Sequence, residues 1–293
     1  MKSLRDVETQ LMRYRETGND ALLDAVGTYF AENTPASPQG RLLHVWHAQA
    51  AHDFTLASRI LAPALQGNNI DAWLLAANLQ RVMGNSSAAE TACQRVSDTA
   101  PLQGQLCLLQ VRVHRGDKPD PAQLSELQRL YKWMHQNRSL THEQHAWIMG
   151  IFTEAHLALN EPLKSRHWSA QAYATSPTVQ NRAAHASQLL LTGEADEVLR
   201  LIDTSETAPA LVVLRLRALQ RLGQLDSVAA TVNQVDRQFR HDIAHNDLLH
   251  AREMAVFYLD ILPDQALAEH LARKNWALQK ELEDRRLLER VEG

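Results

Sequence analysis

The chain has 293 residues, of which 45% are hydrophobic, and its 30 Lys and Arg stand against 34 Asp and Glu, for a net charge of −4. This length fits two ordinary domains or one elongated array of repeats. The scattered, nearly balanced charges argue against a nucleic-acid surface, and no apolar run approaches the roughly 18 residues that cross a bilayer. We expect a folded protein that binds no nucleic acid and does not span a membrane.

Residues 1–37 are predicted to form an N-terminal helical capping hairpin, ended by the turn-forming run at 33–40. No signal peptide is visible after Met1, as expected of a cytoplasmic protein. A trimmed mature chain would begin in the same way. The cytoplasm and the periplasm therefore both stay open.

Residues 38–104 carry two similar units. In the second unit an aromatic residue, small residues, a turn glycine and a closing proline follow one another at Trp73, Ala77, Gly84, Ala89 and Pro101. This order resembles the tetratricopeptide repeat, a helical hairpin of about 34 residues. The preceding unit has the same layout around Trp46, with Ala57 at the position that Ala89 takes in the second unit. The spacing predicts two stacked helical hairpins.

Residues 105–178 are predicted to form less regular helical hairpins. Asp120 before a proline and Thr141 three residues before Gln144 are helix-start signals. The apolar runs at 106–114 and 211–219 have the density of strands, but their place in the helical period predicts helices and no sheet. Cys93 and Cys107 lie on successive predicted helices, where a disulfide is possible. We favour two small buried side chains without a bond, because two cysteines in a chain of this size make no disulfide framework.

Residues 179–246 repeat one helix–turn–helix junction, with Gly193 and Gly223 slightly less than one family period apart. This predicts two further repeats. Residues 247–293 are predicted to form a C-terminal hairpin, turning at Pro263, and a capping helix.

The templates for enzymes are missing from the sequence, because it holds neither a glycine-rich phosphate loop nor a nucleophile elbow. Three histidine pairs have helical spacing: His44 with His47, His142 with His145, and His241 with His245. The last pair is the best candidate for a metal site, which makes a metal-handling or small-molecule-binding protein the alternative function. Ordinary surface histidines explain the pairs more simply, so we expect no cofactor and no catalytic residue.

The tetratricopeptide resemblance implies an all-α superhelix of stacked antiparallel helical hairpins. Such a protein is a non-enzymatic interaction scaffold that binds a peptide or a partner helix in a concave groove. Within it, Asn78 resembles the asparagine that holds a peptide backbone, and Arg217 with Arg221 suits an acidic ligand. The groove positions carried over from the family are Trp46, Gln49, Asn78, Arg81, Arg217, Gln220 and Arg221.

The run at 268–288 is similar to the end of bacterial tetratricopeptide proteins that are made with an export signal. This similarity covers that run alone. It implies a bacterial source and raises the periplasmic option without deciding it.

Overall fold

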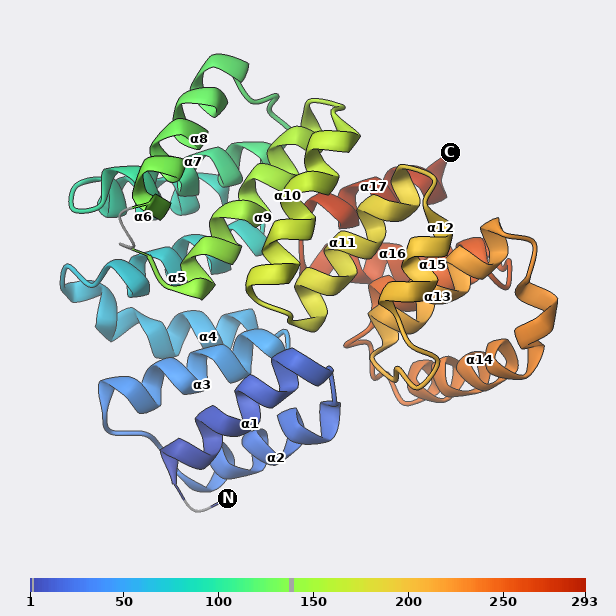
Figure 1. Ribbon diagram of the computed structural model, residues 1–293. Coiled ribbons are helices and arrows are strands. Elements are labelled where there is room, and N and C mark those ends of the chain that lie inside the picture. The colour runs from blue at the N-terminus through green and yellow to red at the C-terminus, as the bar shows by residue number, and fades with distance from the viewer. Residues whose placement is uncertain (2, 137–139) are drawn as a thin grey trace. The chain divides into compact units, whose positions relative to one another are not determined.

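The computed structural model describes every residue except 2 and 137–139, and the described residues form helices and no strand. They divide into two compact units, Met1–Thr178 and Val179–Gly293. The all-α prediction of stacked antiparallel hairpins is confirmed, and both ambiguous apolar runs are helical (Figure 1). No helix in the described part of the chain is long and apolar enough to cross a bilayer. The finer division into five segments stays a prediction.

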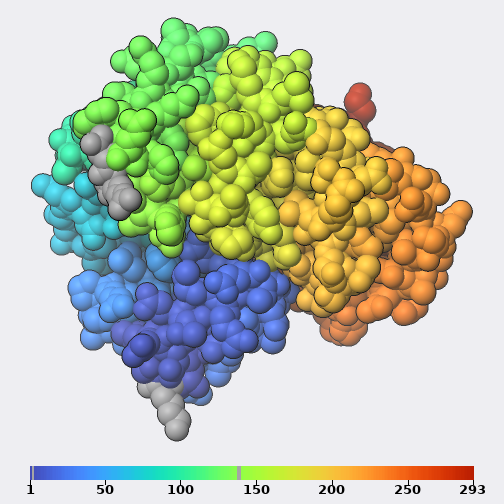
Figure 2. Space-filling view, in the orientation of Figure 1, coloured from blue at the N-terminus to red at the C-terminus, as the bar shows by residue number. Residues whose placement is uncertain are grey.

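Unit 1 consists of successive helix pairs, in which the second helix of a pair packs against the first and against the start of the next pair. Side chains close the spaces between neighbouring ribbons of this unit (Figure 2). Its helices are α1 (Leu4–Thr17), α2 (Asp20–Glu32), α3 (Pro38–Ala50), α4 (Phe54–Leu61), the 3₁₀ turn η1 (Ala62–Gln66), α5 (Ile70–Val82), α6 (Ser86–Ser97), α7 (Pro101–Arg115), α8 (Pro121–Gln136), α9 (His142–Ala158) and α10 (Pro162–Thr175).

Helix α9 is the most deeply packed helix of unit 1. The predicted capping box begins this helix. The Thr141 hydroxyl accepts a hydrogen bond from the main-chain N–H of Gln144, and the side-chain oxygen of Gln144 accepts one from the main-chain N–H of Thr141. Apolar residues cover most of its circumference, so it is buried against both α7 and α10. The fully buried ring of Phe152 lies 4.9 Å from that of Trp168 on α10. Side chains near Phe152 on α9 therefore have well-fixed positions.

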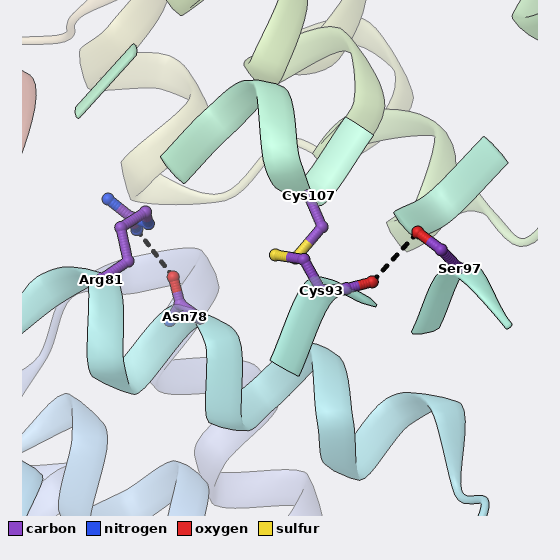
Figure 3. The surroundings of a disulfide bond; sticks show 5 residues. All are labelled: Asn78, Arg81, Cys93, Ser97 and Cys107. Carbon is purple, nitrogen blue, oxygen red and sulfur yellow. Dashed lines mark hydrogen bonds between the residues drawn. A yellow bond between two sulfur atoms is a disulfide. The ribbon is translucent and has the colours of Figure 1, made fainter. Parts of the chain in front are cut away.

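The prediction that the two cysteines are unpaired is wrong: Cys93 of α6 and Cys107 of α7 form a disulfide (Figure 3). Their Cα atoms are 5.5 Å apart, within the range that a disulfide requires. One turn away along the same seam, a Cβ on Gly104 would lie 2.5 Å from the Cα of Ser97, so only glycine permits this approach. The close contact between the two backbones brings the cysteines together, and their spacing in the sequence could not reveal it.

In the first part of unit 2, two helices end at turns that contain Gly193 and Gly223, whose φ values are 84° and 67°. Glycine adopts this left-handed conformation without steric cost, which is why both turns carry it. The helices of unit 2 are α11 (Val179–Leu191), α12 (Ala195–Leu201), α13 (Pro209–Arg221), the 3₁₀ turn η2 (Leu225–Val228), α14 (Ala229–Ala244), α15 (Ala251–Asp260), α16 (Gln265–Leu278) and α17 (Leu282–Glu292).

A buried ionic network docks the last helix of unit 2. The Asp284 side chain is fully buried and accepts two hydrogen bonds from Arg252 of α15, at 2.5 and 2.9 Å. It also accepts from the Asn275 amide at 2.6 Å. Burial lowers the pKa of Arg252, but Asp284 and Glu281 outweigh it, and the pKa lies well above its ordinary value. Arg252 therefore stays protonated, and its hydrogen bonds to Asp284 hold α17 against α15. The hydrogen bond from Asn275 joins α17 to α16.

Candidate functional site

Helices α5, α7 and α9 are the first helices of three successive pairs in unit 1 (Figure 1). Five of their polar side chains contact one another. We call them the Glu154 cluster. Helical spacing of three and four residues puts the members on each helix onto one face. The cluster consists of Asn78 and Arg81 on α5, Gln110 and His114 on α7, and Glu154 on α9.

Arg81 forms the inner part of the cluster and is 7% exposed. Its Nη1 donates to Nδ1 of His114 at 2.7 Å. Its Nη2 donates to Oδ1 of Asn78 at 2.6 Å, a hydrogen bond that Figure 3 shows along one face of α5. The guanidinium group is therefore engaged within the protein and holds the Asn78 amide in one orientation.

His114 connects the arginine to the carboxylate. Its Nε2 lies 3.1 Å from Oε2 of Glu154. Nη1 of Arg81 also lies 3.2 Å from this Nε2, so the imidazole contacts both the guanidinium group and Oε2 of Glu154. Gln110 adds a second hydrogen bond from its Nε2 to the same oxygen, at 3.0 Å.

Burial raises the pKa of the Glu154 carboxyl, but His114, Arg81 and Gln110 together outweigh it. The pKa therefore lies below its ordinary value, and the group stays a carboxylate at neutral pH. A charged group that is partly buried needs polar partners. For Glu154, Gln110 and His114 provide them, both at Oε2.

The outer surface of the Glu154 cluster keeps unused hydrogen-bonding atoms. Oε1 of Glu154, Nδ2 of Asn78 and Oε1 of Gln110 have no hydrogen-bond partner among the described residues. The Glu154 side chain is 23% exposed, and the other two residues are half-buried. The cluster thus presents one amide donor, one amide acceptor and one carboxylate oxygen on a fixed framework.

The structure brings the two predicted residues of α5 into this cluster and places the other two predicted residues of unit 1 on α3. Trp46 is 42% exposed, and Gln49 is half-buried. Sequence reasoning missed Gln110, His114 and Glu154. One signal was available, because Glu154 is the sole charged residue in the largely apolar stretch at 146–155.

In unit 2 the predicted arginines make contacts between neighbouring helices. Nε of Arg217 lies 2.9 Å from Oδ2 of Asp260, and Nη2 of Arg290 lies 2.5 Å from Oδ1 of the same carboxylate. The Gln220 amide donates to the main-chain carbonyl of Asp260. We call these four residues the Asp260 cluster. Arg221 donates to the main-chain carbonyl of Leu190 on α11.

None of the paired histidines belongs to the Glu154 cluster. The rings of His241 and His245 are 4.2 Å apart at the end of α14, and Nδ1 of His245 is bonded to the carbonyl of His241. In the part of the chain that the structure describes, no three His, Cys, Asp or Glu side chains are grouped to hold a metal ion. The metal alternative stays a prediction.

A cleft of 310 Å³ opens between α8, α9 and α10 of unit 1. The buried imidazole of His156 lies in its lining and is hydrogen-bonded to Gln128 and to Glu161, each at 2.7 Å. Burial lowers the pKa of His156 and outweighs the effect of Glu161. Gln128 and Glu161 in this cleft are therefore both hydrogen-bonded to the same imidazole.

No protein-family model matches the chain, and no curated protein matches it. Among solved structures, a chain in the crystal structure of the APC/C hetero-tetramer Cut9–Hcn1 aligns with 98% of this chain, at 16% sequence identity and a TM-score of 0.47. This chain spans 55% of the length of that chain. A likeness of this degree supports no functional assignment.

Proposed function

We propose that the chain is a non-enzymatic interaction scaffold that binds a peptide or a helix of a partner protein on the α5, α7 and α9 face of unit 1. The observation that carries this proposal is the layered Glu154 cluster. Its inner groups, Arg81 and His114, are engaged within the protein, while its outer groups keep unused atoms. A polar surface that is held rigidly before binding loses little conformational entropy on binding.

The outer groups suit a polypeptide. A peptide backbone offers one carbonyl acceptor and one amide donor per residue. Nδ2 of Asn78 donates and Oε1 of Gln110 accepts, so the two amides match one backbone carbonyl and one backbone N–H. We extend the proposed contacts to the exposed Trp46 and to Gln49 on α3. Arg217, Gln220 and Arg221, which the sequence also predicts as contact residues, are left outside the proposed face because they contact neighbouring helices of unit 2.

The disulfide bears on the compartment of this scaffold. Disulfides persist in oxidising compartments and are rare in the cytosol. The Cys93–Cys107 pair therefore favours the periplasmic alternative over the cytoplasmic one. Alkylation of denatured protein, isolated from its source without reductant, tests this point. We expect no free thiol, and two free thiols would contradict the proposal.

Capture of partners from the source organism tests the binding face. The immobilised wild type is compared with a double variant, Asn78→Ala with Gln110→Ala, and bound proteins are identified by mass spectrometry. A matched double variant, Asn233→Ala with Gln234→Ala, removes the same two side-chain types from exposed positions of α14. We expect a protein that is retained by the wild type and by the α14 variant but lost by the cluster variant. Equal retention by all three would exclude this face.

A further inference from the structure

We propose that the Glu154 cluster selects a basic guest, namely a lysine or arginine side chain whose cationic group binds Oε1 of Glu154. This inference rests on the proposed function, because it names the chemistry of the partner at the same face. It differs from the sequence expectation, in which arginines of α13 suit an acidic ligand.

The carboxylate has one oxygen occupied and one available. Oε2 of Glu154 accepts from Gln110 at 3.0 Å and lies 3.1 Å from Nε2 of His114, so it is engaged within the protein. Oε1 accepts no hydrogen bond from the described residues. Two donors on Oε2 fix the plane of the carboxylate, which leaves the lone pairs of Oε1 in a defined direction. A cationic donor forms a stronger hydrogen bond there than a neutral one does.

The positive charge of the cluster lies deeper than the negative charge. Arg81 and His114 are 7% and 5% exposed, whereas the Glu154 side chain is 23% exposed. Two nitrogens of Arg81 are already used by His114 and Asn78. A guest carboxylate would have to displace these hydrogen bonds and approach Glu154, a like charge. A guest ammonium or guanidinium meets the more exposed carboxylate and displaces nothing.

The carboxylate of the Asp260 cluster in unit 2 is held in a different way. There, Arg217 and Arg290 occupy both oxygens of the acid, at 2.9 and 2.5 Å. The protein itself provides the two cationic partners. In the Glu154 cluster one such partner is missing among the described residues, and we assign that position to the guest.

Binding of synthetic peptides tests the charge preference. The probes are fluorescent peptides of randomised sequence and equal length that are identical except at one central position, which is Lys, acetyl-lysine, Gln or Glu. Fluorescence anisotropy measures the dissociation constant for each set with the disulfide-bonded full chain. We expect Lys peptides to bind at least about tenfold more tightly than Gln and acetyl-lysine peptides, and Glu peptides most weakly.

The variant Glu154→Gln keeps the shape of the side chain and removes its charge. We expect it to lose the preference for Lys while still binding the peptides, and Glu126→Gln, on an exposed position of α8, to keep the preference. If Glu154→Gln does not fold, the comparison of Lys with acetyl-lysine peptides on the wild type still tests the charge preference. Binding without charge preference would overturn this inference alone. No binding of any peptide set would overturn the proposed function together with it.

Discussion

The two units treat a part-buried carboxylate in opposite ways. In unit 2, Asp260 lies at the end of α15, and two arginines, from α13 and α17, close both of its oxygens. In unit 1, Glu154 on α9 is held on one oxygen by Gln110 and His114 of α7. An acid that is closed by two cations joins helices and offers little to a ligand. An acid that is fixed on one side and open on the other is arranged to bind a cation.

The same contrast distinguishes the three arginines that the sequence predicts as contact residues. Arg81 lies beneath a surface cluster and orients it, whereas Arg217 and Arg221 connect α13 to neighbouring helices. All three occupy similar positions in their helices, near the C-terminal ends of α5 and α13. Helix position alone therefore does not distinguish a residue that builds a binding surface from one that joins helices.

The largest expected effect concerns the disulfide, which lies within unit 1. Replacing both cysteines, Cys93→Ser with Cys107→Ser, removes a crosslink across a sequence separation of 14, and we expect unit 1 to lose about 3 kcal/mol of unfolding free energy. Unit 2 contains no cysteine and should be unchanged. Hydrogen exchange of amides in each unit measures the two effects separately. An equal loss in both units would show that they unfold together.

The next effect concerns the closed carboxylate. The variant Asp260→Ala leaves Arg217, whose side chain is 21% exposed, without its ionic partner. We expect a loss of about 2 kcal/mol in unit 2, which is below the cost for a fully buried pair because water still reaches this site. The exchange rates of amides in α13 and α15 report it. A loss no larger than that of an ordinary surface substitution, about 0.5 kcal/mol, would show that the two arginines do not join these helices.

A smaller effect is expected for the open carboxylate. Glu154→Gln retains an acceptor for one of the two donors on Oε2, so we expect unit 1 to lose about 1 kcal/mol. The comparison with Asp260→Ala is the informative quantity, since a binding site should contribute less to stability than a structural ion pair. A larger loss for Glu154→Gln would assign Glu154 a structural role.

The smallest effect is a dependence of stability on pH. Because the pKa of Glu154 is lower in the folded protein, its contribution is present above the unfolded pKa of about 4.3 and is lost as the pH falls through the folded pKa. The stability difference between wild type and Glu154→Gln in unit 1 should therefore shrink as the pH falls below that unfolded value. Chemical denaturation across this range measures it, and a constant difference would contradict the lowered pKa.

Much of the fold could be predicted from the sequence, because local signals determine helices. A few neighbouring residues are enough to predict a helix start or a turn, as at the capping pair Thr141 and Gln144 and at the turn glycines Gly193 and Gly223.

The candidate site could be predicted only in part. Asn78 and Arg81 occupy positions that the tetratricopeptide resemblance of the sequence implies, whereas their partner Glu154 lies two helix pairs further along the chain. Only the packing of α7 between α5 and α9 brings Glu154 near them. Such a contact between distant segments leaves no local signal in the sequence.

The disulfide was missed for a related reason. Cysteines at 93 and 107 form a bond because α6 and α7 approach closely at Gly104. That approach is a property of the packed helices. A glycine one turn before Cys107 was the available signal, and its meaning becomes clear only once Ser97 is seen to lie opposite.

Site-specific photocrosslinking in the source organism tests the central claim most directly. A photoreactive amino acid replaces Gln110 in the Glu154 cluster or Gln220 in the Asp260 cluster, so that one glutamine from each unit is compared. We predict that the position in α7 crosslinks to a partner protein, through a segment that contains lysine or arginine, and that the position in α13 does not. A crosslink from α13 alone, or none from either position, would contradict the account.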